Sequence, residues 1–219
     1  MNGKAFIQER VVHISAGKVT LDGNLAIPQG SSGIVLFAHG SGSSRFSPRN
    51  IYVAEVLHKS GIATLLMDLL TPDEGAEDDI TRKMRFDIPF LAERLVGATD
   101  WLSHHQDTQK LRVGYFGAST GAAAALVAAA ERPDIIKAIV SRGGRPDLAG
   151  PGLSKVKAPT LLIVGGRDAV VIDLNRSSLN KLNAEKELVI VPGATHLFEE
   201  SGTLEQVARH AVKWFARYL

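Results

Sequence analysis

The sequence predicts an α/β fold in which a mostly parallel β-sheet is covered by helices on both faces. Three observations lead to this prediction. Short apolar runs rich in β-branched residues alternate with longer segments of helical spacing. Several of the apolar runs are continuous, as expected for parallel strands that are buried on both sides. No internal repeat, low-complexity segment or linker divides the chain, so residues 1–219 are expected to form a single domain.

About eight strands are expected along the chain. The first two, residues 10–14 and 19–27, are joined at Ser15-Ala16-Gly17. The other six are apolar runs at residues 34–38, 62–67, 111–116, 135–140, 160–164 and 187–191. Helical spacing is found at residues 51–59, 82–104, 120–131 and 203–218, and Pro89 is expected to start or kink the second of these helices. The acidic stretch 71–79 contains Pro72 and Gly75 and is expected to be a surface loop.

Composition removes several classes of function. The chain has no cysteine, which excludes disulfides, thiolate metal sites and a cysteine nucleophile. Its 25 Lys and Arg residues are interspersed with 23 Asp and Glu residues, so a nucleic-acid partner is not expected. No apolar run approaches the roughly 20 residues that span a membrane, and the first residues lack the apolar core of a signal peptide. These features predict a soluble protein of the cytoplasm.

Ser119 is the predicted nucleophile. The strand at residues 111–116 leads directly into Gly117-Ala118-Ser119-Thr120-Gly121 and then into a helix, which is the strand–turn–helix setting of a G-x-S-x-G elbow. A serine on such a sharp turn presents its hydroxyl at the edge of the sheet, and the two glycines allow close passage of neighbouring backbone. The alternative is a serine that merely makes a tight turn and caps the helix.

A serine hydroxyl needs a base, normally histidine, which a carboxylate orients. Asp168 follows the strand at residues 160–164, and His196 follows the strand at residues 187–191. Both therefore fall on the same edge of the sheet as Ser119, in the chain order Ser, acid, His. Asp173 is the rival acid, although it lies inside the next expected helix.

The same edge is expected to supply an oxyanion hole. One N–H comes from the residue after the nucleophile, here Thr120, and a second from the loop after an earlier strand. His39-Gly40-Ser41-Gly42-Ser43-Ser44 is the loop in that place, and the backbone N–H of Ser41 is the expected donor, with Gly40 and Gly42 as alternatives. His39 is interpreted as a brace for this loop rather than as a base.

Four motifs in one order resemble the α/β-hydrolase superfamily and, within it, the dienelactone hydrolase family. They are HGSGSS at 39–44, GASTG at 117–121, GGRD at 165–168 and GATHLF at 193–198, and the resemblance extends from about residue 34 to residue 218. It implies an α/β-hydrolase fold with no cofactor and no metal.

Two departures from the family pattern shape the expected function. The namesakes of the family use a cysteine nucleophile, whereas this chain has Ser119, so ordinary ester hydrolysis is the better expectation. Many α/β-hydrolases also carry a cap domain after the sixth strand, but here residues 141–158 are too few for an independent lid. Arg142 and Arg145 in this connector are candidates for contact with a substrate carboxylate, against the plainer interpretation that they stabilise the loop.

The sequence thus predicts a serine hydrolase that acts on small carboxylic esters through an acyl-enzyme, with a small molecule as its partner. A thioesterase or a perhydrolase could use the same three residues, and a ligand-binding protein could retain them without turnover. The oligomeric state and the physiological substrate are left open by the sequence.

Overall fold

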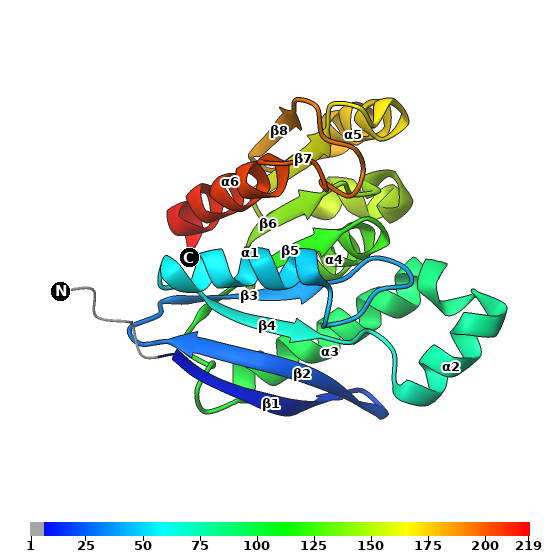
Figure 1. Cartoon of the computed structure of the whole chain (residues 1–219). Coiled ribbons are helices and arrows are strands. Elements are labelled where there is room, and N and C mark those ends of the chain that lie inside the picture. The colour runs from blue at the N-terminus through cyan, green and yellow to red at the C-terminus, as the bar shows by residue number, and fades with distance from the viewer. Residues whose placement is uncertain (1–6) are drawn as a thin grey trace.

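An eight-stranded sheet runs through the centre of the structure, a computed structural model that describes residues 7–219 (Figure 1). Its spatial order is β1-β2-β4-β3-β5-β6-β7-β8. β2 is antiparallel to both of its neighbours, and every pair from β4 to β8 is parallel. The predicted sheet is therefore confirmed. Its strands are β1 (Ile7–Ala16), β2 (Val19–Pro28), β3 (Gly33–Ala38), β4 (Ala63–Met67), β5 (Arg112–Ala118), β6 (Ile136–Arg142), β7 (Thr160–Gly165) and β8 (Lys186–Val191).

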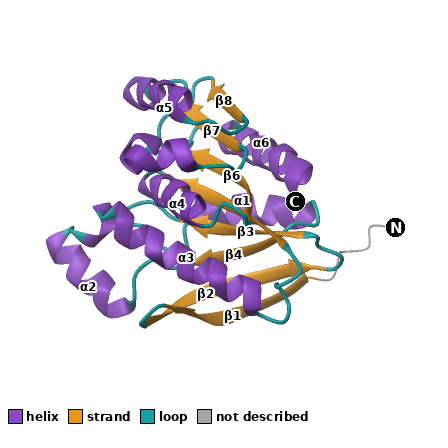
Figure 2. Ribbon diagram, turned by 180° about the vertical axis from the view of Figure 1, so that it is seen from behind, coloured by secondary structure: helices purple, strands orange, loops and turns teal. Residues whose placement is uncertain are grey.

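Helices cover both faces of this sheet, as the sequence predicts. α1 (Pro48–Lys59) and α6 (Thr203–Tyr218) lie on one face (Figure 1). α3 (Ile88–His104), α4 (Thr120–Glu131) and α5 (Ala169–Lys181) lie on the other (Figure 2). The run of four alanines at 122–125 is fully buried against the sheet, and its small side chains let α4 approach β3 and β5 closely.

The stretch 71–79 forms a helix instead of the expected loop. α2 (Pro72–Thr81) begins with a complete capping box, in which the Thr71 side chain accepts the Glu74 N–H and the Glu74 side chain accepts the Thr71 N–H. Pro72 occupies the first helical position, where its missing N–H costs nothing. The presence of Pro72 and Gly75 outweighed these start signals in the sequence-based prediction, which was wrong here.

The helix predicted for residues 82–104 begins later in the structure, at Ile88. A short 3₁₀ helix, η1 (Met84–Phe86), precedes α3, and Pro89 stands in the first turn of α3, so this proline starts the helix. A second 3₁₀ element, η2 (Pro146–Lys155), occupies most of the connector between β6 and β7 and packs on α4. This connector contains no independent cap domain.

Five of the parallel strands, β3 and β5 to β8, bring their carboxyl ends to one edge of the sheet. The loops that leave this edge contain residues 39–44, Ser119, residues 142–145, Asp168 and His196. In parallel sheets, catalytic and binding groups collect at this edge, so the functional site is expected here.

Candidate active site

Ser119 stands on the turn between β5 and α4 in a strained conformation, with φ 51° and ψ −120°. It is the N-cap residue of α4, but its side chain makes no capping hydrogen bond. Serine at an N-cap normally accepts a hydrogen bond from the first turn. A strained backbone combined with an unused capping group points to a function outside the helix.

The two glycines of the elbow are required by close packing. A Cβ on Gly117 would lie 2.8 Å from the Ala122 nitrogen, and one on Gly121 would lie 2.7 Å from the Ala38 carbonyl carbon. Real Cβ atoms essentially never approach other atoms within 3.0 Å. The G-x-S-x-G spacing thus allows α4 to begin directly against the end of β3.

Asp168 and His196 are brought together by the loops after β7 and β8. The His196 Nδ1 and Asp168 Oδ2 atoms are 2.7 Å apart, and the Asp168 side chain is the more buried of the two. Asp168 is the N-cap of α5 and, like Ser119, makes no capping bond with its side chain. Its carboxylate is directed to the imidazole instead.

The rival acid, Asp173, is not at this site. It lies on α5 with an 80% exposed side chain and forms an ion pair with Arg176 at 3.7 Å. Among the acids weighed from the sequence, Asp168 is therefore the one beside His196.

The loop after β6 connects the two halves of the site. The Ser119 N–H donates to the Arg142 carbonyl at 3.3 Å, and the Arg145 N–H donates to the Ser119 carbonyl at 3.1 Å. Between them, Gly143 has a φ of 51°, and a Cβ placed on it would lie 3.6 Å from the His196 ring. Ser119 and His196 therefore flank the same short loop.

The loop of residues 39–44, named the oxyanion loop because it is expected to supply an oxyanion donor, packs on the other side of Ser119. A Cβ on Gly40 would lie 3.2 Å from the Ser119 Cβ, so the loop passes directly over the nucleophile elbow. The Ser41 N–H, the expected oxyanion donor, donates to the Thr120 Oγ1 atom at 3.0 Å. The Thr120 N–H, in the first turn of α4, has no intrahelical partner.

His39 braces this loop, as the sequence suggests. Its Nε2 atom accepts the Leu69 N–H at 3.1 Å, so its Nδ1 atom carries the proton and donates to the Gly40 carbonyl at 3.0 Å. Burial lowers the pKa of His39 below its ordinary value, and only the neutral ring can make both bonds.

We expect this brace to make the stability of the protein pH-dependent. Because the folded-state pKa of His39 lies below the unfolded value of 6.5, the unfolded chain binds the proton more readily, and stability falls as the pH drops below that value. Urea unfolding at about pH 7.5 and about pH 5 should show a smaller loss for His39→Gln than for the wild type. The exposed His104→Gln variant should keep the wild-type difference, and an equal loss in the His39 variant would contradict the assignment.

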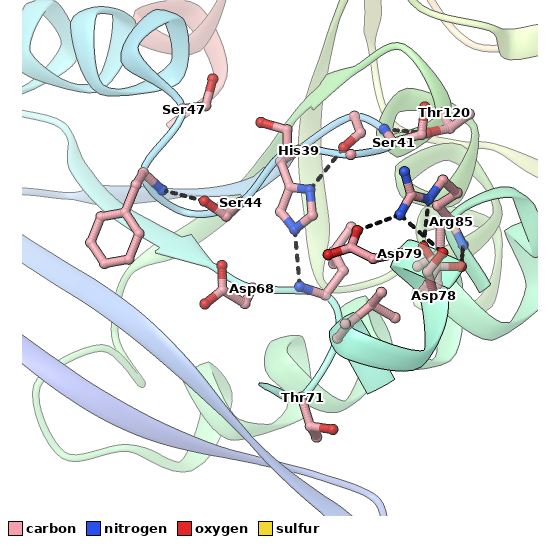
Figure 3. Close-up of a pocket in the computed structure, with 18 of the residues that line it drawn as sticks. His39, Ser41, Ser44, Ser47, Asp68, Thr71, Asp78, Asp79, Arg85 and Thr120 are labelled. Atoms are coloured by element: carbon pink, nitrogen blue, oxygen red, sulfur yellow. Dashed lines mark hydrogen bonds and ion pairs between the residues drawn. The ribbon is translucent and has the colours of Figure 1, made fainter. Parts of the chain in front are cut away.

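A cavity of about 550 Å³ opens beside the oxyanion loop (Figure 3). Gly40, Ser41 and Thr120 contribute to its wall, so it borders the turn that carries Ser119, but Ser119, Asp168 and His196 do not themselves line it. The apolar part of its lining comes from the loops around β4 and from helices α1, α2 and α3, namely Phe46, Pro48, Leu69, Leu70, Pro72 and Leu91. The same wall also has charged side chains, namely Asp22, Asp68, Asp78, Asp79 and Arg85. The size suits a small organic group.

An ion pair between Asp78 and Arg85 holds the helix that borders this cavity. The Asp78 carboxylate accepts the Arg85 Nε–H at 2.5 Å and the backbone N–H groups of Met84 and Arg85 at 2.7 and 3.1 Å. Burial alone would raise the pKa of Asp78, but these hydrogen bonds outweigh it and lower the pKa. A Cβ on Gly42 would lie 3.3 Å from Arg85 Nη1, so the Asp78–Arg85 ion pair also lies against the oxyanion loop.

The two connector arginines do not line the described cavity. Arg145 forms a bidentate pair with Asp147 at 2.9 and 2.8 Å, which is the loop-stabilising arrangement. Arg142 is buried, and its Nε and Nη1 atoms have no hydrogen-bond partner among the described residues. Burial and the nearby Arg49 lower its pKa to about 10.

Residues 7–219 contain no group of three or more His, Asp or Glu side chains placed to hold a metal ion. Within the same residues, none of the helices has the length and apolar character required to cross a bilayer.

Comparisons with known proteins place this chain in a family. Residues 21–219 match the model of the dienelactone hydrolase family. A dienelactone hydrolase from Anabaena variabilis is 64% identical, with a TM-score of 0.96 over 97% of this chain and 99% of that one. Est1E from Butyrivibrio proteoclasticus, whose structure has ferulic acid bound, shares the fold at 18% identity, with a TM-score of 0.80 over 94% of this chain and 98% of that one.

One relative has a different name. A Mycobacterium tuberculosis protein named putative phosphoribosyl transferase is 57% identical over 213 residues, which cover 97% of this chain but 47% of the relative. This chain thus spans about half the length of that relative. The family match over residues 21–219 and the close structural likeness agree, and the chain belongs to the dienelactone hydrolase family, whose structure here is an α/β-hydrolase fold.

Proposed function

We propose that the chain is a serine hydrolase that cleaves small carboxylic esters through an acyl-enzyme. One observation carries this proposal. Two residues at helix N-caps, Ser119 and Asp168, have side chains that make no capping bond, and the Asp168 carboxylate instead holds His196 at 2.7 Å. A merely structural serine and aspartate would be expected to satisfy the first turns of their helices.

The proposed reaction has two steps. His196 Nε2 takes the Ser119 proton as Oγ attacks the ester carbonyl, and the C=O electron pair moves onto oxygen to give a tetrahedral oxyanion. The C–O bond to the alcohol then breaks and the alcohol leaves with the proton from His196. Water, activated by the same imidazole, releases the acid and restores Ser119. Asp168 fixes the Nδ1–H tautomer, which leaves Nε2 free to act as the base.

The cavity supports a small substrate. Its volume of about 550 Å³ and the apolar part of its lining, which includes Phe46, Leu70 and Leu91, suit a short acyl chain or one aromatic ring. The connector between β6 and β7 adds only η2, so within residues 7–219 no separate cap domain follows β6. Neither Arg142 nor Arg145 lines this cavity, so we assign neither of them to the substrate, and we place the acyl group against the apolar part of the wall.

The transferase name of the mycobacterial relative concerns, in our proposal, the part of that protein that this chain does not match. The matched region covers 97% of a chain whose fold is the hydrolase fold, whereas more than half of the relative lies outside the match.

The test is covalent labelling combined with turnover. A fluorophosphonate should label Ser119, identified by peptide mass spectrometry, and the protein should release p-nitrophenol from p-nitrophenyl acetate with saturation. A panel of esters and thioesters of increasing acyl length should then show a maximum at short chains. An absence of both labelling and turnover would favour the ligand-binding alternative, and a preference for thioesters would point to a thioesterase.

A further inference from the structure

The structure raises a question about the second donor of the oxyanion hole. A backbone N–H has a single hydrogen, and that of Ser41 is already donated to the Thr120 hydroxyl oxygen at 3.0 Å (Figure 3). The amide that the sequence assigns to the oxyanion is therefore engaged by a side chain. This side chain belongs to the residue that follows the nucleophile.

Thr120 is held in this position by its surroundings. It is the first residue of α4 and is 4% exposed, and it contributes to the wall of the cavity beside the oxyanion loop. β-Branching leaves threonine few χ1 rotamers in a helix. The hydroxyl is therefore held beside the Ser41 amide, on the residue that directly follows Ser119.

The Thr120 hydroxyl has a hydrogen still to donate. It accepts from Ser41, and within residues 7–219 no acceptor takes its own O–H. A hydroxyl that accepts one hydrogen bond becomes a better donor, because the first bond polarises the second. The same residue also offers its backbone N–H from the first turn of α4, at the positive end of the helix dipole.

We propose that Thr120 provides two donors to the oxyanion, its backbone N–H and its side-chain hydroxyl, and that the Ser41 amide acts through that hydroxyl. When Ser119 attacks, the C=O electron pair moves onto oxygen, and the Thr120 O–H and N–H donate to this oxygen without transferring a proton. When the C=O bond re-forms and the alcohol leaves, both hydrogens are still on Thr120. This inference rests on the proposed hydrolase function.

The opposite arrangement makes a different prediction. If the hydroxyl merely occupied the place of the oxyanion in the resting site, a substrate would have to displace it, and removal of the hydroxyl would free the Ser41 N–H. The variant would then be as active as the wild type, or more active.

Thr120→Val and Thr120→Ser separate the two arrangements. Valine has nearly the same shape as threonine and lacks the hydroxyl, whereas serine keeps it. We expect Thr120→Val to lower kcat by about 10- to 100-fold. This is somewhat less than the usual effect of removing one oxyanion donor, because the freed Ser41 N–H can donate to the oxyanion in place of the hydroxyl. KM should change by less than about threefold, and Thr120→Ser, which keeps the hydroxyl without the β-branch, should recover most of the kcat that Thr120→Val loses.

A transition-state analogue separates a role in oxyanion binding from a purely structural effect. Only a role in oxyanion binding would change the inhibition constant and kcat by the same factor. The inhibition constant of a trifluoromethyl ketone, which forms an oxyanion on Ser119, should rise in Thr120→Val by the same factor by which kcat falls. Thr120→Ala, a better helix former, repeats the measurement if valine lowers the Tm.

Measurements on the wild type distinguish a failure of the Thr120 proposal from a failure of the proposed hydrolase function. A wild-type protein that neither reacts with a fluorophosphonate nor hydrolyses esters would remove the hydrolase proposal itself. A wild type that does both, together with a Thr120→Val variant of equal or higher kcat, would overturn only the role of the hydroxyl.

Discussion

Replacement of Ser119 by alanine is expected to lower kcat for ester hydrolysis by about four to six powers of ten. The variant retains the Asp168–His196 pair and the oxyanion donors, but it has no atom that can form the acyl-enzyme. Its stability should be nearly unchanged, because the Ser119 side chain makes no capping bond in the folded protein. Steady-state kinetics on p-nitrophenyl esters, together with a thermal melt, measure both quantities.

A double variant makes this expectation sharper. If Ser119 and His196 work as a unit, Ser119→Ala/His196→Ala should be no slower than Ser119→Ala alone, since the imidazole has no proton to take. Ser154→Ala, an exposed serine in η2, provides the matched control and should behave as the wild type. Retention of more than about a tenth of the activity in Ser119→Ala would contradict its assignment as nucleophile.

The parts of the fold that the sequence predicted are those that burial dictates. A parallel strand covered on both faces, such as β3 or β7, is apolar at nearly every position, and the sequence shows this as an apolar run. The same runs locate the carboxyl edge of the sheet. The residues that follow them, including Asp168 and His196, could therefore be placed on one edge, and the 2.7 Å contact between these two is consistent with that placement.

The parts that the sequence did not predict depend on competition between local signals or on contacts between distant segments. α2 was missed because Pro72 and Gly75 read as loop residues, although Thr71 and Glu74 form a capping box around that proline. The Thr-Pro-Asp-Glu order was the available signal. From the sequence, Asp78 was interpreted as part of a surface loop. Its burial is explained by the ion pair with Arg85, which the sequence alone does not indicate.

Contacts between distant loops lay beyond sequence reasoning. The backbone donors of an oxyanion hole can be expected from motif order, but nothing in the motif indicates that the Thr120 side chain would take the Ser41 N–H. Arg142 is a second case. A cation just after the expected strand suggests an accessible binding group, whereas Arg142 is the last residue of β6 and its side chain is buried.

The second glycine of the elbow gives the largest expected effect on stability. In Gly121→Ala the new Cβ would lie 2.7 Å from the Ala38 carbonyl carbon and closer still to the carbonyl oxygens of Ala38 and His39. These are backbone atoms of the β3 end, which cannot rotate aside as a flexible side chain can. We expect a loss of about 3 kcal/mol in the free energy of unfolding, measured by urea denaturation.

Gly75→Ala is the matched control. It tests whether the loss of stability in Gly121→Ala comes from the close contacts at residue 121 rather than from replacing a glycine as such. Gly75 lies within α2, and a Cβ there would meet no atom within 4 Å, so alanine should stabilise the protein by about 0.5–1 kcal/mol. Gly121→Ala should have the opposite sign. It should also lower kcat, because the start of α4 must move away from β3 and would carry Thr120 away from Ser41, whose bond is 3.0 Å long. Wild-type stability together with wild-type kcat in Gly121→Ala would mean that the elbow can accept a Cβ at this position. The close approach of α4 to the oxyanion loop would then not be needed to position the donors.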